Sequence, residues 1–416
     1  MREKLTIHGG TPLKGTLEIS GAKNSALPLL ASSLLTEQRV HLTNVPDLKD
    51  VETMLSMVGE LGKSTSGEAG EVSIAGKIDS NHAPADLVKK MRASFLVLAP
   101  LVARTGKAEV PIPGGCNIGT RPVDLHLKGL ERLGVNIAQE DGKIVARADG
   151  LSGNDVFLNY PSVGATEQLI MAATMAKGET AIYNAAQEPE IRDLVNFLNQ
   201  MGAEIRINGS IIRINGVEEL DRTEYRVMSD RIAAGTYLIA GAATAGSVTV
   251  TGVDTSAVKP LSLKLKNAGI TVREKDNSIK VASSERPENI EVITLPYPGF
   301  PTDLQAPITA LLTLARGKSV VKETVFDSRF DHVPELNKMG ADISMTNSNT
   351  LFVEGKTSLR GTEVEATDIR AGAALVIEGL AAEGKTTITG VKHLDRGYSN
   401  LVTNLRNLGA QLERHK

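Results

Sequence analysis

The feature that most constrains the fold is an internal repeat. Six glycines, each following a helix-like amphipathic stretch that ends in an apolar residue, recur about 70 residues apart along the 416-residue chain. They are Gly62, Gly134, Gly202, Gly269, Gly340 and Gly409. A second landmark is a short polar turn between an Ala- and Leu-rich stretch and a β-branched stretch. It recurs at Gly106, Gly178, Gly246, Gly317 and Gly384, with Glu37-Gln38 in that place in the first copy. Two landmarks with one period predict six copies of a single unit.

Each copy has the pattern strand, helix, strand, helix, strand, strand. In the third copy the predicted elements are residues 156–159, 166–175, 180–183 and 189–201, with two short strands around Ile205 and Ile212. The second helix of each copy is amphipathic, with apolar residues at i, i+3 and i+4. The first helix is apolar nearly all round, as in residues 93–99, 233–245 and 373–377. A helix without a polar face has to be enclosed by other elements.

The repeat therefore predicts a mixed α/β protein. Three copies per domain would place three apolar helices inside a wall of sheets and outer helices, which is a two-lobed inside-out α/β barrel, or prism, of six βαβαββ repeats. No Pro/Gly/Ser-rich linker marks the lobe boundary, so the repeat places it between Val227 and Asp230. Residues 1–20 carry a strand pair, 4–7 and 15–19, that can complete either lobe.

Composition excludes several classes of protein. A net charge of -3, no Trp and 3% aromatic residues argue against a nucleic-acid surface. One cysteine excludes a disulfide framework, and no apolar run approaches the ~20 residues of a membrane span. The N-terminus lacks a signal-peptide pattern, so the expected location is the cytoplasm. The seven His show no metal-ligand spacing and no phosphate-loop or dinucleotide motif is present, so neither a metal nor a cofactor is expected.

The single cysteine, Cys116, lies in a Gly- and Pro-rich loop over residues 111–124. Such a loop is neither a helix nor a central strand, which leaves the thiol accessible. Arg121, five residues further on, favours a thiolate or binds an anion. The alternative is that Cys116 is a small buried hydrophobic residue.

The copies align six polar residues at the start of the enclosed helix. These residues are Lys23, Arg92, Ser162, Arg231, Asp303 and Arg370. Free N–H groups at a helix start favour anions, whereas a cation there is unfavourable by ~0.3–1 kcal/mol. We therefore expect an anionic ligand at these positions.

The loop after the middle strand varies most between copies. It holds four further candidates, Cys116, Arg121, Arg329 and Arg396. For any one of these arginines the alternative is a surface ion pair. For Asp303 three roles stay open: a general base, a structural partner of a cation, or a helix N-cap.

Several motifs together resemble one family. They are Gly21-Ala22-Lys23-Asn24, Arg92-Ala93-Ser94, Gly114-Gly115-Cys116 with Arg121-Pro122-Val123-Asp124, Ser162-Val163-Gly164-Ala165-Thr166, Phe300-Pro301-Thr302-Asp303, Thr367-Asp368-Ile369-Arg370 and Asp395-Arg396-Gly397-Tyr398. The chain resembles the UDP-N-acetylglucosamine enolpyruvyl transferase family from its first strand to its last helix.

The resemblance implies transfer of the enolpyruvyl group of phosphoenolpyruvate to the 3-hydroxyl of UDP-N-acetylglucosamine with release of phosphate. This is the first committed step of peptidoglycan synthesis. It implies an N-terminal lobe of residues 22–228, a C-terminal lobe of residues 1–21 plus 229–416, and an active site in the interdomain cleft, with the Cys116 loop as a lid. It also implies a cytoplasmic enzyme, a target of fosfomycin, without nucleic-acid or membrane partners. We expect a monomer.

The resemblance also assigns roles to residues. Asp303 would be the base and Cys116 the acid, while Lys23, Arg121 and Arg396, assisted by Arg370, would grip phosphoenolpyruvate. The implied substrate-binding residues are Lys23, Asn24, Arg92, Arg121, Pro122, Val123, Asp124, Leu125, Ser162, Val163, Gly164, Asp303, Val325, Asp368, Arg370 and Arg396.

Two positions depart from the family pattern. Tyr160 stands where many members have a basic residue, and Ala233 stands where a glutamate is usual. Three alternatives to the implied function stay open. They are the shikimate-pathway enolpyruvyl transferase, a catalytically silent sugar-nucleotide-binding paralogue, and a fold-related nucleic-acid end-processing enzyme.

Overall fold

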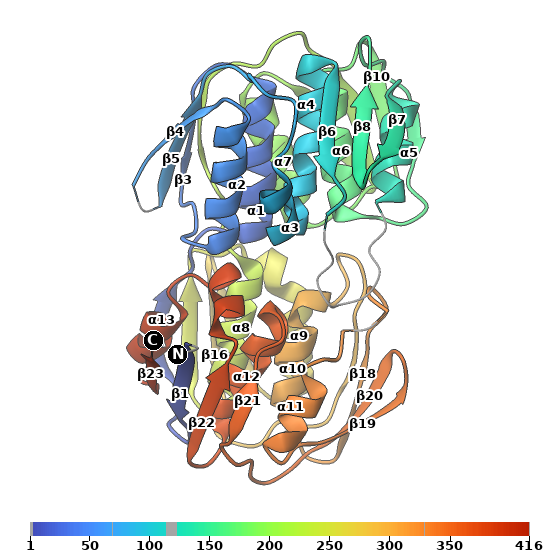
Figure 1. Ribbon diagram of the computed structural model, residues 1–416. Coiled ribbons are helices and arrows are strands. Elements are labelled where there is room, and N and C mark those ends of the chain that lie inside the picture. Colours follow the sequence, from blue (N-terminus) through green and yellow to red (C-terminus); the bar gives the residue numbers. More distant parts are fainter. Residues whose placement is uncertain (1–2, 69, 114–122, 328, 416) are drawn as a thin grey trace. The chain divides into compact units, whose positions relative to one another are not determined.

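The computed structural model describes residues 3–68, 70–113, 123–327 and 329–415. Contacts within the chain divide these residues into two compact units (Figure 1). The first unit comprises residues 21–113 and 123–228, and the second comprises residues 3–20 and 229–415. The apolar cores follow the same division, since each core cluster draws on one unit alone.

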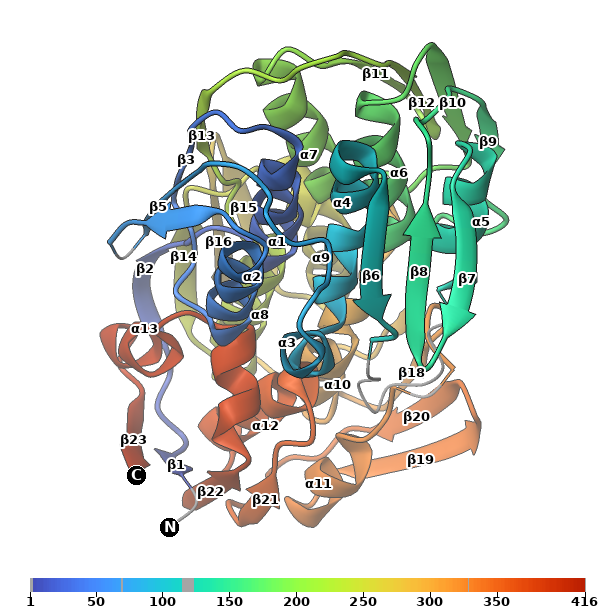
Figure 2. The ribbon, with the colours of Figure 1, turned by 45° about the horizontal axis from the view of Figure 1, so that its top comes forward.

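In the first unit, the described strands form three sheets. Two are four-stranded, in the orders β13-β3-β5-β4 and β11-β12-β10-β9, and one is three-stranded, β6-β8-β7 (Figure 2). The strands are β3 (Val40–Thr43), β4 (Ser64–Ser66), β5 (Glu71–Ala75), β6 (Lys107–Pro111), β7 (Asn136–Glu140), β8 (Lys143–Arg147), β9 (Asp155–Phe157), β10 (Glu179–Tyr183), β11 (Glu204–Asn208), β12 (Ile211–Asn215) and β13 (Thr223–Arg226). Each four-stranded sheet has one parallel edge strand, β13 or β9, and two antiparallel pairings. In the three-stranded sheet, a bridge between His82 and Glu109 stands where the parallel edge strand would be.

In the second unit, the described strands form three four-stranded sheets, β15-β16-β14-β2, β17-β18-β20-β19 and β21-β22-β1-β23. The strands are β1 (Lys4–His8), β2 (Lys14–Glu18), β14 (Ser247–Thr251), β15 (Thr271–Lys275), β16 (Ser278–Ala282), β17 (Glu291–Ile293), β18 (Lys318–Lys322), β19 (Asp342–Asn347), β20 (Thr350–Glu354), β21 (Glu363–Glu365), β22 (Lys385–Thr389) and β23 (Gln411–His415). The two N-terminal strands do not pair with each other. The two strands predicted ahead of the first helix are both present: β1 lies between β22 and β23, whereas β2 pairs with β14.

Enclosed helices occupy the core of each unit. They are α1 (Lys23–Ser32), η2 with α4 (Arg92–Val97 and Leu98–Thr105) and α6 (Val163–Thr174) in the first unit, and α8 (Arg231–Ala243), η4 with α10 (Thr302–Leu304 and Gln305–Leu312) and α12 (Ile369–Ala381) in the second. Within the second unit α8, α10 and α12 pack on one another (Figure 1). All residues of α8 from Arg231 to Ala242 are buried, which confirms that a helix apolar on every side is enclosed.

Amphipathic helices pack against the enclosed helices and the edge strands of the sheets. They are α2 (Lys49–Glu60), α3 (Ala85–Lys90), α5 (Asp124–Arg132), α7 (Pro189–Gln200), α9 (Lys259–Asn267), α11 (Val333–Lys338) and α13 (Leu401–Asn407), with short turns η1 (Ser33–Leu35), η3 (Thr255–Val258) and η5 (Val391–Arg396). The prediction of a mixed α/β fold is confirmed by this mixture of sheets and helices.

The six landmark glycines have one structural cause. Each follows the last residues of an outer helix and has a positive φ, between 78° and 106°. Gly62 shows the arrangement: its N–H donates to the Gly59 carbonyl and the next N–H donates to the Val58 carbonyl. This closure of a helix end requires a left-handed residue, for which glycine carries no steric penalty.

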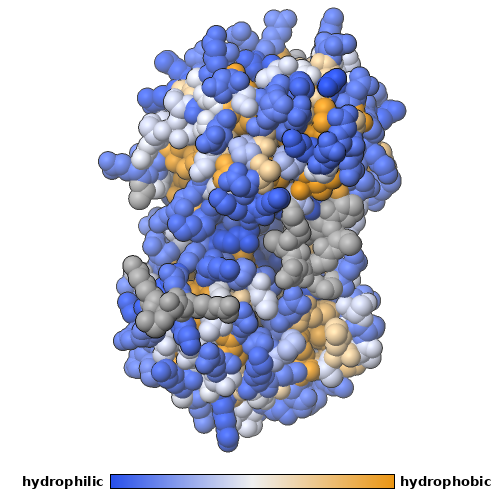
Figure 3. All heavy atoms as spheres, viewed as in Figure 1, coloured by the Kyte–Doolittle hydropathy of each residue, from blue (hydrophilic) through white to orange (hydrophobic). Residues whose placement is uncertain are grey.

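Among the described residues no helix is both long and apolar enough to span a bilayer. Hydrophilic residues predominate on the face drawn in Figure 3. The large exposed hydrophobic side chains include Phe157, Leu263 and Met345, which belong to separate elements.

The buried carboxyl group of Glu378, in α12, leads to a prediction about the stability of the fold. Glu378 is 0% exposed and both of its carboxylate oxygens lack a hydrogen-bond partner in the described structure. Burial raises the pKa of Glu378 well above its usual value. Replacing Glu378 with Leu should therefore raise the free energy of unfolding at pH 7 by about 1–3 kcal/mol, because unsatisfied buried polar atoms are removed.

The pH dependence of this effect has a fixed sign. A folded-state pKa above the unfolded value of about 4.3 means that stability is fully present below that value and is lost as pH rises. The gain of Glu378→Leu measured by urea unfolding should thus be larger at pH 7 than at pH 4. Glu383→Leu, at an exposed position just beyond α12, is the control and should change stability little. An equal gain at both pH values would contradict the account.

Candidate functional site

The six polar residues predicted at helix starts do lie there. Lys23, Arg92 and Arg231 are the first residues of α1, η2 and α8. Ser162 is the N-cap of α6, and its Oγ accepts from Ala165 N at 3.4 Å. Asp303 and Arg370 are the second residues of η4 and α12.

Aspartate side chains cap α8 and α12, whose first turns hold Arg231 and Arg370. Asp230 Oδ1 accepts from the backbone N–H groups of Ile232 and Ala233 at 2.8 and 2.9 Å. Asp368 Oδ1 accepts from those of Arg370 and Ala371 at 2.7 and 3.1 Å. These caps satisfy helix-start donors and place negative charge beside the arginines.

The carboxylate of Asp303 lies between two arginines. Arg329 Nη2 donates to Asp303 Oδ1 and Arg370 Nη2 donates to Asp303 Oδ2, both at 2.7 Å. Arg329 and Arg370 are 7% and 5% exposed, whereas the Asp303 side chain is 24% exposed. The two ion pairs of Asp303 are therefore largely buried. The alternative that Arg329 forms a surface ion pair is wrong.

The helix-cap role considered for Asp303 is also wrong. Pro301 occupies the N-cap position of η4, and no side chain caps that turn. Burial alone would raise the pKa of the Asp303 carboxyl, but the guanidinium groups of Arg370 and Arg329 outweigh burial and hold that pKa well below its usual range. Asp303 is thus an ionised carboxylate paired with cations.

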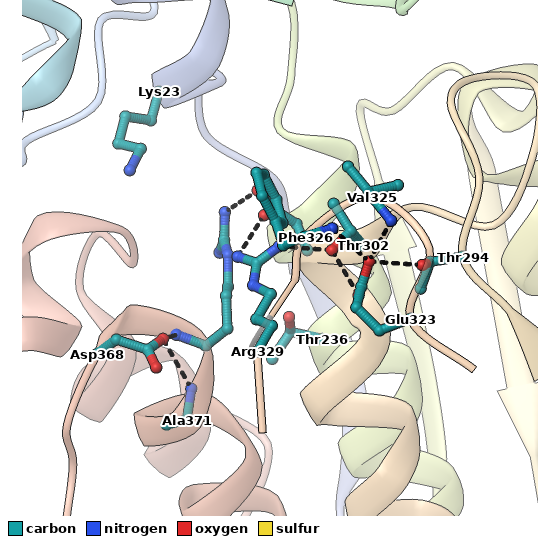
Figure 4. Close-up of polar contacts among 12 residues, drawn as sticks. Lys23, Thr236, Thr294, Thr302, Glu323, Val325, Phe326, Arg329, Asp368 and Ala371 are labelled. Atoms are coloured by element: carbon teal, nitrogen blue, oxygen red, sulfur yellow. Dashed lines mark hydrogen bonds and ion pairs between the residues drawn. The ribbon is translucent and has the colours of Figure 1, made fainter. Parts of the chain in front are cut away.

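Hydrogen bonds extend from these ion pairs in two directions, and Figure 4 draws those that link Arg329, Thr302 and Glu323. On one side, Arg370 Nη1 lies 3.1 Å from the Tyr398 hydroxyl, which lies 3.0 Å from Thr236 Oγ1. On the other side, Arg329 Nη1 donates to Thr302 Oγ1 at 2.8 Å, and Thr302 donates to Glu323. The network ties α8, η4, α12 and the loop after β18 together.

The close approach of the Gly397 backbone to α12 explains how Tyr398 reaches Arg370. A Cβ on Gly397 would lie 2.4 Å from Ile369 Cγ2, so only glycine allows this loop to approach the start of α12. Asp395 instead pairs with Arg414, with 2.6 Å between Oδ1 and Nη1. Arg396 is the last residue of η5. The pKa of His393 is lowered by burial and, to a smaller extent, by the charges of Lys392 and Arg396.

In the first unit, the start of α1 is held by two buried carboxylates. Lys23 Nζ lies 3.3 Å from Asp50 Oδ2, and the Asp50 side chain is 5% exposed. Asp193 accepts hydrogen bonds from Ser25 Oγ and, at 2.7 Å, from the Tyr225 hydroxyl. Gly21 is required before the helix because a Cβ there would lie 1.8 Å from the Asn44 carbonyl oxygen.

Several predicted residues of the first unit lie near a buried histidine. His126, on α5 with Asp124 and Leu125, packs edge-on against Phe95, with 5.7 Å between ring centroids. A Cβ on Gly164 would lie 2.9 Å from His126 Cε1. Burial and the charge of Arg92 lower the pKa of His126 to about 4, against the opposing effect of Asp124. His126 is therefore neutral at physiological pH.

The structure leaves some predicted residues untested. Cys116, Arg121 and Pro122 lie outside the described residues, and Val123 directly precedes α5. In the described part of the chain, no group of three or more His, Cys, Asp or Glu side chains is arranged to hold a metal ion.

Sequence reasoning missed Glu323, Asp50, Asp193 and His126, and it named Thr302 and Tyr398 only as parts of motifs. Thr302 and Tyr398 directly adjoin Asp303 and the Arg396 loop, which is the one signal that could have found them. Glu323, Asp50 and Asp193 look in the sequence like ordinary polar residues of strand ends and helices. Only the folded chain shows that they are buried beside the site.

Comparison with known proteins identifies the class of enzyme to which this chain belongs. The family model described as EPSP synthase (3-phosphoshikimate 1-carboxyvinyltransferase) matches residues 7–405. The solved structure of the enolpyruvyl transferase NikO from Streptomyces tendae superposes with a TM-score of 0.90 at 26% identity, covering 99% of each chain. EPSP synthase from Acinetobacter baumannii, at 20% identity and a TM-score of 0.76 over 100% of each chain, shares the fold. The chain is thus an enolpyruvyl transferase in fold and class.

Curated relatives narrow the class. UDP-N-acetylglucosamine 1-carboxyvinyltransferase 2 of Carboxydothermus hydrogenoformans is 52% identical over 99% of both chains. UDP-N-acetylglucosamine 1-carboxyvinyltransferase 1 of Caldanaerobacter subterraneus subsp. tengcongensis is 47% identical over 100% of both. The chain belongs to the UDP-N-acetylglucosamine 1-carboxyvinyltransferase family.

Proposed function

We propose that this enzyme transfers the enolpyruvyl group of phosphoenolpyruvate to the 3-hydroxyl of UDP-N-acetylglucosamine and releases phosphate. The names of its full-length relatives support both substrates. The observation that carries the chemistry is the ionised Asp303 carboxylate, held between Arg329 and Arg370 where η4 leads into α10. Such a carboxylate is a proton acceptor beside cations that attract an anionic substrate.

The proposed reaction is an addition followed by an elimination. The sugar 3-hydroxyl oxygen attacks the enol carbon while its proton passes to Asp303, and Cys116 delivers a proton to the methylene carbon. The resulting tetrahedral adduct then returns a proton from its methyl carbon to Cys116, its carbon–oxygen bond to phosphate breaks, and Asp303 gives its proton to the departing phosphate. Lys23, Arg121, Arg370 and Arg396 bind the phosphate and carboxylate groups of phosphoenolpyruvate.

Through Arg370, the binding of phosphoenolpyruvate can change the basicity of Asp303. With both arginines in place, Asp303 is a weak base, because its pKa lies well below the usual range. When the anionic groups of phosphoenolpyruvate attract Arg370, one of the two ion pairs of Asp303 weakens and its proton affinity rises. The base is then strongest when the second substrate is present.

The remaining expectations belong to the same proposal. We propose that Asn24, Arg92, Asp124, Leu125, Ser162, Val163, Gly164, Val325 and Asp368 contribute to binding the sugar nucleotide, and that residues of both units serve one active site. The reaction would be the first committed step of peptidoglycan synthesis, carried out in the cytoplasm by a monomer that fosfomycin inhibits.

We further propose that the six sheets are copies of one βαβαββ unit, three in each lobe of an inside-out prism. The shared pairing pattern, a parallel edge strand followed by two antiparallel pairings, supports this view for five of the sheets described. The enclosed helices support it as well.

The test is phosphate release from phosphoenolpyruvate with each acceptor. The wild-type enzyme should release phosphate with UDP-N-acetylglucosamine and not with shikimate 3-phosphate. Turnover with shikimate 3-phosphate alone would assign the chain to the shikimate-pathway reaction. Binding of the sugar nucleotide without phosphate release would identify a silent paralogue.

Arg396 provides a prediction about the anion site. Replacing Arg396 with Ala should raise KM for phosphoenolpyruvate at least tenfold more than KM for UDP-N-acetylglucosamine, because the guanidinium is proposed to contact only the anion. Steady-state kinetics with each substrate varied in turn measure both constants. Arg406→Ala, on α13 of the same unit, is the control and should change neither constant. Equal increases in both constants for Arg396→Ala would contradict the assignment.

A further inference from the structure

The buried carboxylate of Glu323 has no part in the chemistry described so far. Glu323 directly follows β18 and is 1% exposed. Its Oε1 accepts from Thr294 Oγ1 at 2.7 Å and from the backbone N–H groups of Val325 and Phe326 at 2.8 and 3.2 Å. Its Oε2 accepts from Thr302 Oγ1 at 2.8 Å. The two oxygens thus have separate partners: Oε1 binds Thr294 and the loop after β18, whereas Oε2 binds Thr302.

Thr302 connects this carboxylate to the proposed base. A hydroxyl has one proton and two lone pairs, and Thr302 gives its proton to Glu323. A lone pair is then available to Arg329 Nη1, which donates to Thr302 Oγ1 at 2.8 Å. The other terminal nitrogen of Arg329 donates to Asp303. Both terminal nitrogens of the Arg329 guanidinium are thus bound, one to Thr302 and the other to Asp303 (Figure 4).

The negative charge of Glu323 strengthens this connection. A hydroxyl that donates to a carboxylate becomes a better acceptor, because hydrogen bonds in a chain polarise one another. Thr302 therefore holds Arg329 more firmly when its hydroxyl donates to Glu323. Loss of the Oε2 acceptor would let the Thr302 proton turn toward Arg329, where it repels the donor.

We infer that Glu323 is a positioning residue for the proposed reaction: through Thr302 it keeps the Arg329 guanidinium against Asp303. This inference rests on the proposed function. It differs from a purely structural role, in which Glu323 would do no more than anchor the turn at Val325 and Phe326. Glutamine at position 323 separates the two roles, because its carbonyl oxygen can replace Oε1 on the turn while its amide group replaces Oε2.

Five variants test the inference by steady-state kinetics. Glu323→Gln and Thr302→Val should each lower kcat at least about tenfold, with KM for UDP-N-acetylglucosamine within about threefold of wild type, since small displacements of reacting groups cost large factors in rate. The double variant should be no slower than the slower single variant, because both changes break one connection. Thr302→Ser keeps the hydroxyl and should stay within about threefold of wild type. Thr313→Val is the control, since its buried hydroxyl bonds only to the Ala310 carbonyl of its own helix.

Other results would contradict the role inferred for Glu323. If Thr302→Val keeps the turnover of Thr313→Val, or if the effects of Glu323→Gln and Thr302→Val multiply in the double variant, Glu323 does not act through Thr302. If the wild type itself releases no phosphate, the proposed function fails. The connection is then tested by urea unfolding: Glu323→Gln and Asp303→Asn, which share no direct contact, should have non-additive effects on stability. Additive effects would overturn the inference.

Discussion

Replacement of Asp303 with Asn is expected to lower turnover about 10²–10⁴-fold while UDP-N-acetylglucosamine binding stays within about tenfold of wild type. Asparagine has the shape of aspartate but cannot accept the proton of the sugar hydroxyl. Phosphate release gives the rate, and calorimetric titration gives the affinity for the sugar nucleotide. Near-normal turnover would show that Asp303 is only the structural partner of Arg329 and Arg370.

A stability effect accompanies this loss of activity and has to be separated from it. Asp303→Asn leaves two arginines, each less than 10% exposed, without their shared carboxylate. Breaking a buried pair in this way typically costs about 3–5 kcal/mol. Asp331→Asn, at a partly buried position two residues after Arg329, is the matched control and should keep turnover within about twofold.

The pH dependence of stability identifies the charge that is lost. Because the folded-state pKa of Asp303 is lowered, its contribution to stability is present above the unfolded value of about 3.9 and is lost as pH falls through the folded-state pKa. The stability difference between wild type and Asp303→Asn should thus be constant from pH 5 to 8 and shrink in more acidic solution. A difference that grows on acidification would have the wrong sign.

The second large effect concerns Cys116. Its proposed role as an acid needs a proton at neutral pH, whereas alkylation needs the sulfur atom. Cys116→Asp should therefore retain substantial turnover yet resist fosfomycin. Cys116→Ser, a far weaker acid, should lose product formation or release by about 10²-fold or more.

Intact-protein mass spectrometry checks the reactive character of the thiol. Wild-type enzyme mixed with fosfomycin and UDP-N-acetylglucosamine should gain one covalent adduct on the peptide that contains Cys116, and Cys116→Asp should gain none. An unmodified wild type, together with equal losses of melting temperature in both variants, would instead support a packing role for this cysteine.

The recurring landmarks made the mixed α/β content predictable, because these landmarks have local causes. A left-handed glycine after each outer helix and a helix apolar on every side depend on a few neighbouring residues, so Gly62 and the stretch 233–245 indicated their structures directly. Strand partners depend on distant segments. The pairing of β1 with β22 and β23 joins the two ends of the chain, and nothing near residue 4 indicates it.

The positions of Asp303 and Arg370 were predictable, but their pairing was not. The sequence predicts both residues at helix starts, and the cost of a cation there predicts an external anion. In the structure, Asp303 itself supplies an anion to Arg370, and Asp368 caps the same helix. Glu323 could not be foreseen, because its importance comes from burial beside Thr302 and from no pattern in its neighbours.

The central claim, enolpyruvyl transfer to the sugar nucleotide, is tested most directly by the product. Mass spectrometry of a reaction with phosphoenolpyruvate and UDP-N-acetylglucosamine should show the sugar nucleotide heavier by one enolpyruvyl group, with one phosphate released per molecule formed. Unchanged UDP-N-acetylglucosamine, in a reaction where the folded wild-type enzyme binds it, would contradict the account.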